Sequence, residues 1–155
     1  MYAQGNDFVK DFAKRTRKNY EKAASGPYEI TQLINSTVGL LIIPKEKQSD
    51  AISDTMLNNQ LLQKMKSCVM VNTYPKSLTL CQICRHLRNA ISHSRMEFDA
   101  GRPSSPSKPL AIQNIIFRDE HVENNIIVAE FEIKVSVDLL REFLFAFSDA
   151  VMNLP

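Results

Sequence analysis

Apolar residues along the chain of 155 residues follow two different spacings. In most of the chain they recur every three to four positions, which places them on one face of an α-helix. One of these segments, 28–43, has no charged residue between Glu29 and its end, so it should be the buried central helix. The segments predicted to be helical are 4–25, 28–43, 49–71, 79–93 and 136–152.

A different spacing marks the stretch before the last helix. Residues 112–117 and 126–135 are rich in Ile, Val and Phe, and in the second of them charged and apolar residues alternate. A two-residue period is typical of a strand with one buried face. The polar stretch 118–125 should be the turn between two strands. We therefore expect a mainly α fold, an up-and-down helical bundle with a small β-hairpin over 112–135 inserted before the C-terminal helix.

Length and composition indicate one globular domain over residues 1–155. A chain of 17.6 kDa with 44% hydrophobic and 23% charged residues can bury a single core. Residues 100–110 are rich in Pro and Ser, which predicts a flexible loop. The most apolar run, 40–44, is too short to span a bilayer, so no membrane segment is expected.

Charge and cysteine content narrow the class of protein. A net charge of +2 permits RNA binding but does not predict it. Three cysteines without a secretory leader favour a cytoplasmic protein. Cys81 and Cys84 form a C-x-x-C motif, but a zinc site needs four ligands and only Cys68 and His86 remain as distant candidates. We expect both cysteines of the motif to pack in the core, and we expect no metal and no cofactor. A small redox or zinc protein remains an alternative hypothesis.

Polar side chains gather on the helix predicted at 79–93. His86, Asn89 and His93 have spacings that place them on one helical face. Arg88 and His93 are five residues apart, an offset of about 140° on an ideal helix. A site that uses both needs a bent helix end, a long Arg side chain that reaches round, or a second copy of the chain. The alternative is a purely structural role, in which Arg88, Asn89 and His93 cap the end of the helix. The helical face next to that of His86, Asn89 and His93 carries Arg85, Arg88 and Ser92.

The segment Leu87-Arg88-Asn89-Ala90-Ile91-Ser92-His93 resembles the Arg-polar-x-x-x-His signature of HEPN domains, which are compact α-helical bundles. The segment 28–44 and the hairpin after the signature are similar to one plasmid-borne branch of that family. Many family members are metal-independent endoribonucleases that dimerise with their signature helices facing each other. The resemblance thus implies a composite site shared by two chains.

The resemblance also implies a role for each signature residue. His93 would be the general acid or base, Arg88 would hold the scissile phosphate, and Asn89 would orient the imidazole or the phosphate. Family toxins that are paired with a nucleotidyltransferase antitoxin carry a Tyr two positions after the His, where this chain has Arg95. Regulation by nucleotide transfer to that Tyr is therefore not expected. Candidates for contacts with flanking RNA are Arg85, His86, Ser92 and Arg95.

Two functional hypotheses follow from the resemblance. The first is a homodimeric endoribonuclease that cleaves RNA by 2′-hydroxyl attack, a toxin or defence effector with an antitoxin or regulatory protein as partner. The second is a non-catalytic HEPN module that binds a nucleotide or a protein, in which the signature serves dimer packing.

Overall fold

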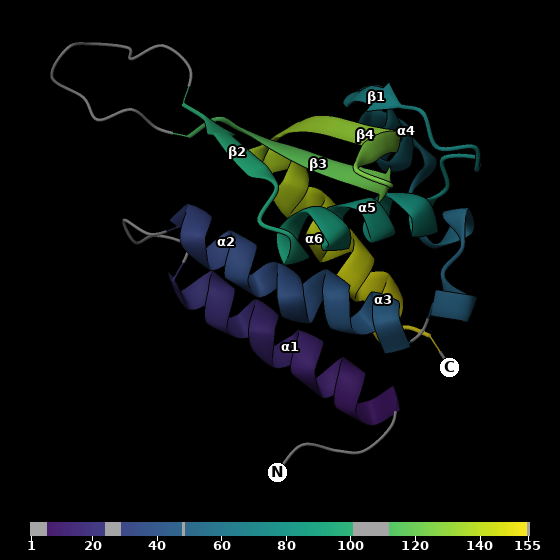
Figure 1. Cartoon of the computed structure of the whole chain (residues 1–155). Helices are drawn as coiled ribbons and strands as arrows, with labels where there is room; N and C mark the ends of the chain where they lie inside the picture. Colours follow the sequence, from purple (N-terminus) through teal and green to yellow (C-terminus); the bar gives the residue numbers. More distant parts are fainter. Residues whose placement is uncertain (1–5, 24–28, 48, 101–111, 155) are drawn as a thin grey trace, which may run out of the picture.

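The computed structural model describes residues 6–23, 29–47, 49–100 and 112–154. Within these residues a four-stranded antiparallel sheet lies on two helices, and further helices cover the other side of those two (Figure 1). The elements in chain order are α1 (Asn6–Ala23), α2 (Glu29–Thr37), the π-helix η1 (Val38–Ile42), α3 (Ile43–Lys47), the 3₁₀ turns η2 (Ser49–Ala51) and η3 (Asp54–Met56), α4 (Asn59–Ser67), β1 (Val69–Asn72), α5 (Leu80–Ser92), β2 (Met96–Asp99), β3 (Asn114–Glu123), β4 (Ile126–Ser136) and α6 (Val137–Met152).

The helix predicted at 28–43 extends to Lys47 as α2, η1 and α3, which follow one another without a break. Gly39 of η1 lies against α1. A Cβ atom added there would be 2.8 Å from both the Phe12 ring and the Cβ of Thr16, closer than side chains pack. The absence of a side chain at Gly39 therefore allows α1 and η1 to approach each other closely.

The long third helix predicted at 49–71 is wrong. Two 3₁₀ turns and the shorter α4 take its place. Ser53 is extended, and its hydroxyl accepts a hydrogen bond from the backbone N–H of Thr55; Asn58 caps α4 by accepting from the N–H of Gln60. These side chains satisfy backbone groups that a continuous helix would have paired, so the chain restarts its helix twice.

The expected hairpin is the centre of a larger sheet. Its strands β3 and β4 lie between two short edge strands, in the order β1-β4-β3-β2. β3 runs on to Glu123, through much of the polar stretch predicted as a turn, and the reversal occurs at Asn124 and Asn125, both with positive φ. The expectation of a helical bundle with a small hairpin is therefore only partly right, because two further strands extend the hairpin.

The hydrophobic core extends from the sheet across α5 and α6 to α1, α2 and η1. Because α5 lies between the sheet and the other helices, it is placed directly beneath β3 (Figure 1). The predicted loop over 100–110 lies outside the described residues except for Ala100. None of the helices in the described part of the chain is long and apolar enough to cross a membrane. Core residues from these elements include Ile83, Leu87, Ile115, Phe117, Phe131, Ile133, Phe143 and Phe147.

Candidate functional site

Helix α5 carries the site residues and has well-defined ends. At its start, the Thr79 hydroxyl accepts a hydrogen bond from the N–H of Gln82. At its end, Ser94 has a φ of 54°, and the N–H of Arg95 donates to the carbonyl of Ala90 at 2.8 Å. This is the Schellman arrangement that terminates many helices. It leaves His93, the C-cap residue, exposed at the helix end.

One edge of α5 opens into a polar pocket of about 410 Å³. The pocket lies between α5, the segment after β1 and the second half of β3. Its lining carries both cationic and anionic groups as well as the half-buried Asn89 and the exposed His93. The lining residues are Tyr74, Pro75, Lys76, Gln82, Arg85, Asn89, His93, Asp119, Glu120 and His121.

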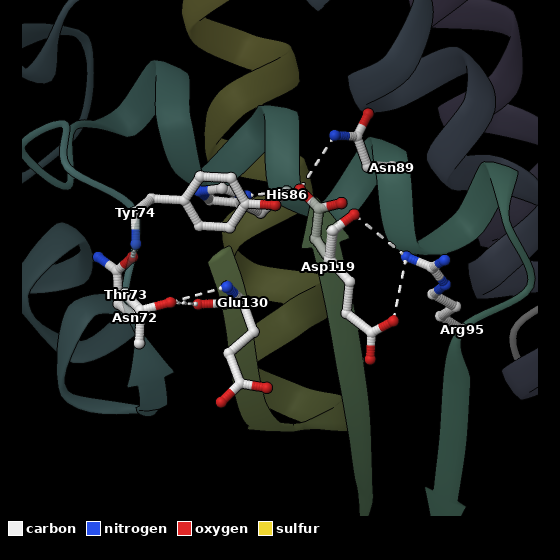
Figure 2. Close-up of polar contacts among 9 residues, drawn as sticks. Asn72, Thr73, Tyr74, His86, Asn89, Arg95, Asp119 and Glu130 are labelled. Atoms are coloured by element: carbon white, nitrogen blue, oxygen red, sulfur yellow. Dashed lines mark hydrogen bonds and ion pairs between the residues drawn. The ribbon is translucent and has the colours of Figure 1, made fainter. Parts of the chain in front are cut away.

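A buried carboxylate connects α5 to β3. Asp119 is only 4% exposed, and its Oδ2 atom lies 2.7 Å from His86 Nδ1 and accepts a hydrogen bond from Asn89 Nδ2 at 3.0 Å (Figure 2). Because an ionised carboxylate only accepts hydrogen bonds, the proton of His86 is on Nδ1. These two contacts with Asp119 therefore fix the orientations of the His86 and Asn89 side chains on α5.

The ring of His86 is enclosed by two other rings. It stacks on Phe131 with centroids 4.2 Å apart. On another side lies the ring of Tyr74, whose centroid is 4.6 Å from that of His86 (Figure 2). Burial lowers the pKa of His86, and Arg85 adds to this, although Asp119 acts in the opposite direction. His86 is 2% exposed, so the expectation that it contacts RNA is wrong. His86 instead contacts Tyr74 and Asp119, which line the pocket, and so supports its wall.

Comparison with known proteins identifies the family. A family model described as HEPN pEK499 p136 matches residues 1–154. The chain belongs to this HEPN family. The resemblance based on the Arg88–His93 segment is thereby confirmed. Neither a curated protein nor a solved structure gave a match.

The HEPN signature residues do not all face the same way. Asn89 and His93 line the pocket, whereas Arg88 points toward α3, with its Nε 3.3 Å from Glu46 Oε1. The two atoms are close enough for an ion pair, but they are not aligned as a hydrogen bond. Within one chain Arg88 and His93 therefore point in different directions. This agrees with the offset of about 140° that a separation of five residues produces on a helix.

The remaining predicted contact residues have different surroundings in this HEPN domain. Arg85 is exposed and lines the pocket, whereas Ser92 is exposed but is not among the lining residues. Arg95 donates a hydrogen bond to the carbonyl oxygen of Glu120 at 3.4 Å and lies 3.7 Å from its carboxylate. The positive charge of Arg95 is therefore partly neutralised within the chain.

Sequence reasoning missed the half of the pocket that does not come from α5. Tyr74 and Lys76 follow β1, which was not predicted, and Asp119 lies in the stretch expected to be a turn. Burial raises the pKa of Tyr74, and the negative charge of the nearby Asp119 raises it further, so the phenol stays protonated. The signal for Asp119 was the two-residue period of Ile115 and Phe117, which continues to position 119.

The C-x-x-C motif lies at the start of α5. Cys84 is completely buried in the core, Cys81 is half-buried, and burial raises the pKa of the Cys84 thiol above its ordinary value. A buried neutral thiol is a poor nucleophile and a poor metal ligand. Among the described residues no three His, Cys, Asp or Glu side chains gather as a metal site would require. The complete burial of Cys84 favours core packing as the role of the motif.

Proposed function

We propose that this HEPN domain is a metal-independent endoribonuclease that acts as a homodimer. The observation that carries the proposal is the shared pocket wall of Asn89 and His93, beside the cationic Arg85 and Lys76. An open polar pocket with an exposed imidazole and nearby cations suits a flexible polyanion such as single-stranded RNA.

The reaction uses groups that the chain itself provides. The 2′-hydroxyl oxygen of the RNA forms a bond to phosphorus while the bond from phosphorus to the 5′-oxygen breaks, which leaves a 2′,3′-cyclic phosphate. The hydroxyl proton goes to a base, and a proton must reach the departing 5′-oxygen. An imidazole can serve in either step at neutral pH, and His93 is exposed in the pocket to do so.

The position of Arg88 supports the proposed homodimer. A guanidinium stabilises the charge on a phosphate in the transition state through two parallel hydrogen bonds. Arg88 of the same chain lies on another side of α5, beside Glu46. We therefore propose that Arg88 of one chain acts together with His93 of a second chain, across a two-fold axis that brings both α5 helices together.

The proposal is tested by RNA cleavage in the presence of chelator. Wild-type protein should cut single-stranded RNA of varied sequence, and His93→Ala should lose about 100-fold or more of that activity because it lacks the acid or base. Asn153→Ala is the matched control, since Asn153 is also an exposed C-cap residue, at the end of α6. Intact RNA after incubation with the wild-type protein would reject the nuclease.

A non-catalytic HEPN module is the second candidate. The observation in its favour is the ion pair between Arg88 and Glu46, which occupies the guanidinium that catalysis would need. Such a module would bind a nucleotide or a protein partner and would retain the signature for dimer packing. Tight RNA or nucleotide binding by the wild-type protein without any cleavage would favour this candidate over the nuclease.

The proposed nuclease has a further biological implication. An enzyme with an open pocket and no required metal would act on cellular RNA as soon as it folds. We therefore extend the proposal to a toxin or defence effector whose activity an antitoxin or another regulatory protein restrains. The exposed His93 and Arg85 at the pocket are the groups that such a partner would have to cover.

A further inference from the structure

Asp119 is a buried charge whose role the proposed reaction does not explain. It comes from the second half of β3, where it is paired with Phe131 of β4. A buried carboxylate is costly unless hydrogen bonds compensate for the lost water. Here a single oxygen, Oδ2, is shared by His86 and Asn89. The cost is thus met by groups of α5, and one of these belongs to the HEPN signature.

The contact with Asp119 decides which end of the Asn89 amide faces the pocket. An amide has a donor end and an acceptor end, and a carboxylate can pair only with the donor. Asn89 donates through Nδ2, so its carbonyl oxygen Oδ1 is turned away from Asp119 (Figure 2). Asn89 lines the pocket, and Oδ1 is the hydrogen-bonding atom of its amide that Asp119 does not contact.

His86 makes this arrangement rigid. Its ring is stacked on Phe131 and lies next to that of Tyr74, and its Nδ1 holds the same oxygen of Asp119 that Asn89 uses. The carboxylate therefore has little freedom to rotate away from Asn89. A fixed acceptor loses less entropy and needs less reorganisation when a substrate hydroxyl binds than a free amide would.

We propose that Asp119 is a positioning residue for RNA cleavage: it holds the Asn89 amide so that Oδ1 accepts a hydrogen bond from the attacking 2′-hydroxyl. This inference rests on the proposed function. It assigns the Oδ1 atom of Asn89 to the sugar rather than to the phosphate, because a carbonyl oxygen cannot donate to a phosphate oxygen. Asp119 acts only through Asn89 and does not touch the RNA.

The first test is the substitution Asp119→Asn. The amide that replaces the carboxylate is a neutral acceptor, which holds His86 and Asn89 less strongly than the charged oxygen does. The Asn89 amide therefore loses its fixed orientation. We expect kcat to fall about 10- to 100-fold with little change in KM, since misplacement of one group affects the reacting geometry more than binding. Asp50→Asn, on the exposed turn η2, is the matched control and should keep wild-type kcat. A kcat of Asp119→Asn equal to that of wild type overturns the proposal.

A double-mutant cycle separates positioning from general damage. If Asp119 acts through Asn89, then Asn89→Ala alone and Asn89→Ala combined with Asp119→Asn should have the same kcat. Independent losses that multiply in the double variant overturn the proposal. Should Asp119→Asn fail to fold, His86→Phe takes its place, because phenylalanine keeps a ring beside Phe131 and Tyr74 but cannot donate a hydrogen bond to Asp119.

An NMR measurement tests the contact without RNA. The side-chain amide protons of Asn89 should shift between wild type and Asp119→Asn, and should be unchanged in Asp50→Asn. If wild type cleaves no RNA although these signals shift, the proposed function fails while Asp119 still orients Asn89. If wild type cleaves RNA and the signals do not shift, the positioning role is wrong and the nuclease stands.

Discussion

A histidine between two arginines on a helix is a reasonable candidate for RNA contact, yet burial gives His86 another role. Its ring lies between Phe131 and Tyr74, and its Nδ1 faces Asp119. Desolvation disfavours the imidazolium more than the carboxylate favours it, so its pKa is lowered. His86 therefore enters the folded protein as a neutral donor of one hydrogen bond.

The lowered pKa of His86 predicts a pH dependence of stability. The unfolded chain protonates this histidine near its ordinary value of 6.5, whereas the folded chain resists protonation until a lower pH. Between these values the unfolded state binds more protons, so the free energy of unfolding falls as the pH drops below about 6.5. The contribution is fully present above that pH. Thermal unfolding of the wild-type protein between pH 7.5 and 5 should show a falling Tm.

His86→Gln isolates this effect. Glutamine can still donate to Asp119 but does not titrate, and the variant keeps His93 and His121. Its Tm at pH 7.5 should be lower than that of wild type because the ring stacking is lost. Its further decrease towards pH 5 should be smaller. An equal decrease in both proteins would mean that His86 is not the group that titrates.

The candidate site could be predicted from the sequence where it follows one helix. Spacing alone placed Asn89 and His93 together and separated Arg88 from them, because an α-helix has a fixed angle per residue. Asp119 could not be assigned in the same way. Its contact with α5 depends on which strand packs against that helix, and this is a property of the tertiary fold.

At the scale of elements, the end of α5 contains a strained residue. Ser94 has a φ of 54°, the left-handed region in which a side chain costs about 1 kcal/mol. Ser94→Gly should therefore stabilise the protein by roughly 0.5 to 1 kcal/mol, since glycine adopts this conformation freely but is also more flexible when unfolded. Chemical denaturation measures the change.

The control for this prediction is the same substitution two residues earlier. Ser92 is the last residue of α5 and exposed, so Ser92→Gly should destabilise the protein by up to about 1 kcal/mol. Opposite signs for the two variants would show that backbone conformation, rather than loss of a serine side chain, decides the effect. Destabilisation by both would contradict the prediction.

The helices and central strands were easier to predict than the edge strands. β3 and β4 are 10 and 11 residues long and contain several Ile and Val residues, whereas β1 and β2 are four residues each, Val69–Asn72 and Met96–Asp99. Such short strands show no period of their own. They are strands because β4 and β3 offer unpaired backbone groups along their outer edges, and only the assembled hairpin creates those edges.

At the scale of the whole molecule, the opposed positions of Arg88 and His93 predict complementation between two inactive variants. Arg88→Ala and His93→Ala should each cut RNA poorly on their own. After mixing and exchange of subunits, half of the dimers are mixed, and each of these holds one of the two cross-chain pairs. About a quarter of wild-type activity should therefore return. RNA cleavage before and after mixing measures it.

Two controls accompany the mixing experiment. Light scattering should show a dimer for each variant, because a monomer has no cross-chain pair to restore. Wild type mixed with the double variant Arg88→Ala, His93→Ala should lose activity as mixed dimers form, since these contain no complete cross-chain pair. Mixed single variants that stay inactive although dimers exchange would place Arg88 and His93 in separate sites.

The π-helix η1 has a consequence for how the chain tolerates changes in length. The N–H of Ile43 bonds to the carbonyl of Val38, five residues back, so η1 absorbs one residue more than an α-helix would hold. Removal of one residue from 38–42 would convert η1 to α-helix and leave α3 facing α5. A deletion elsewhere in 29–47 would rotate α3 by about 100° and turn Glu46 away from Arg88.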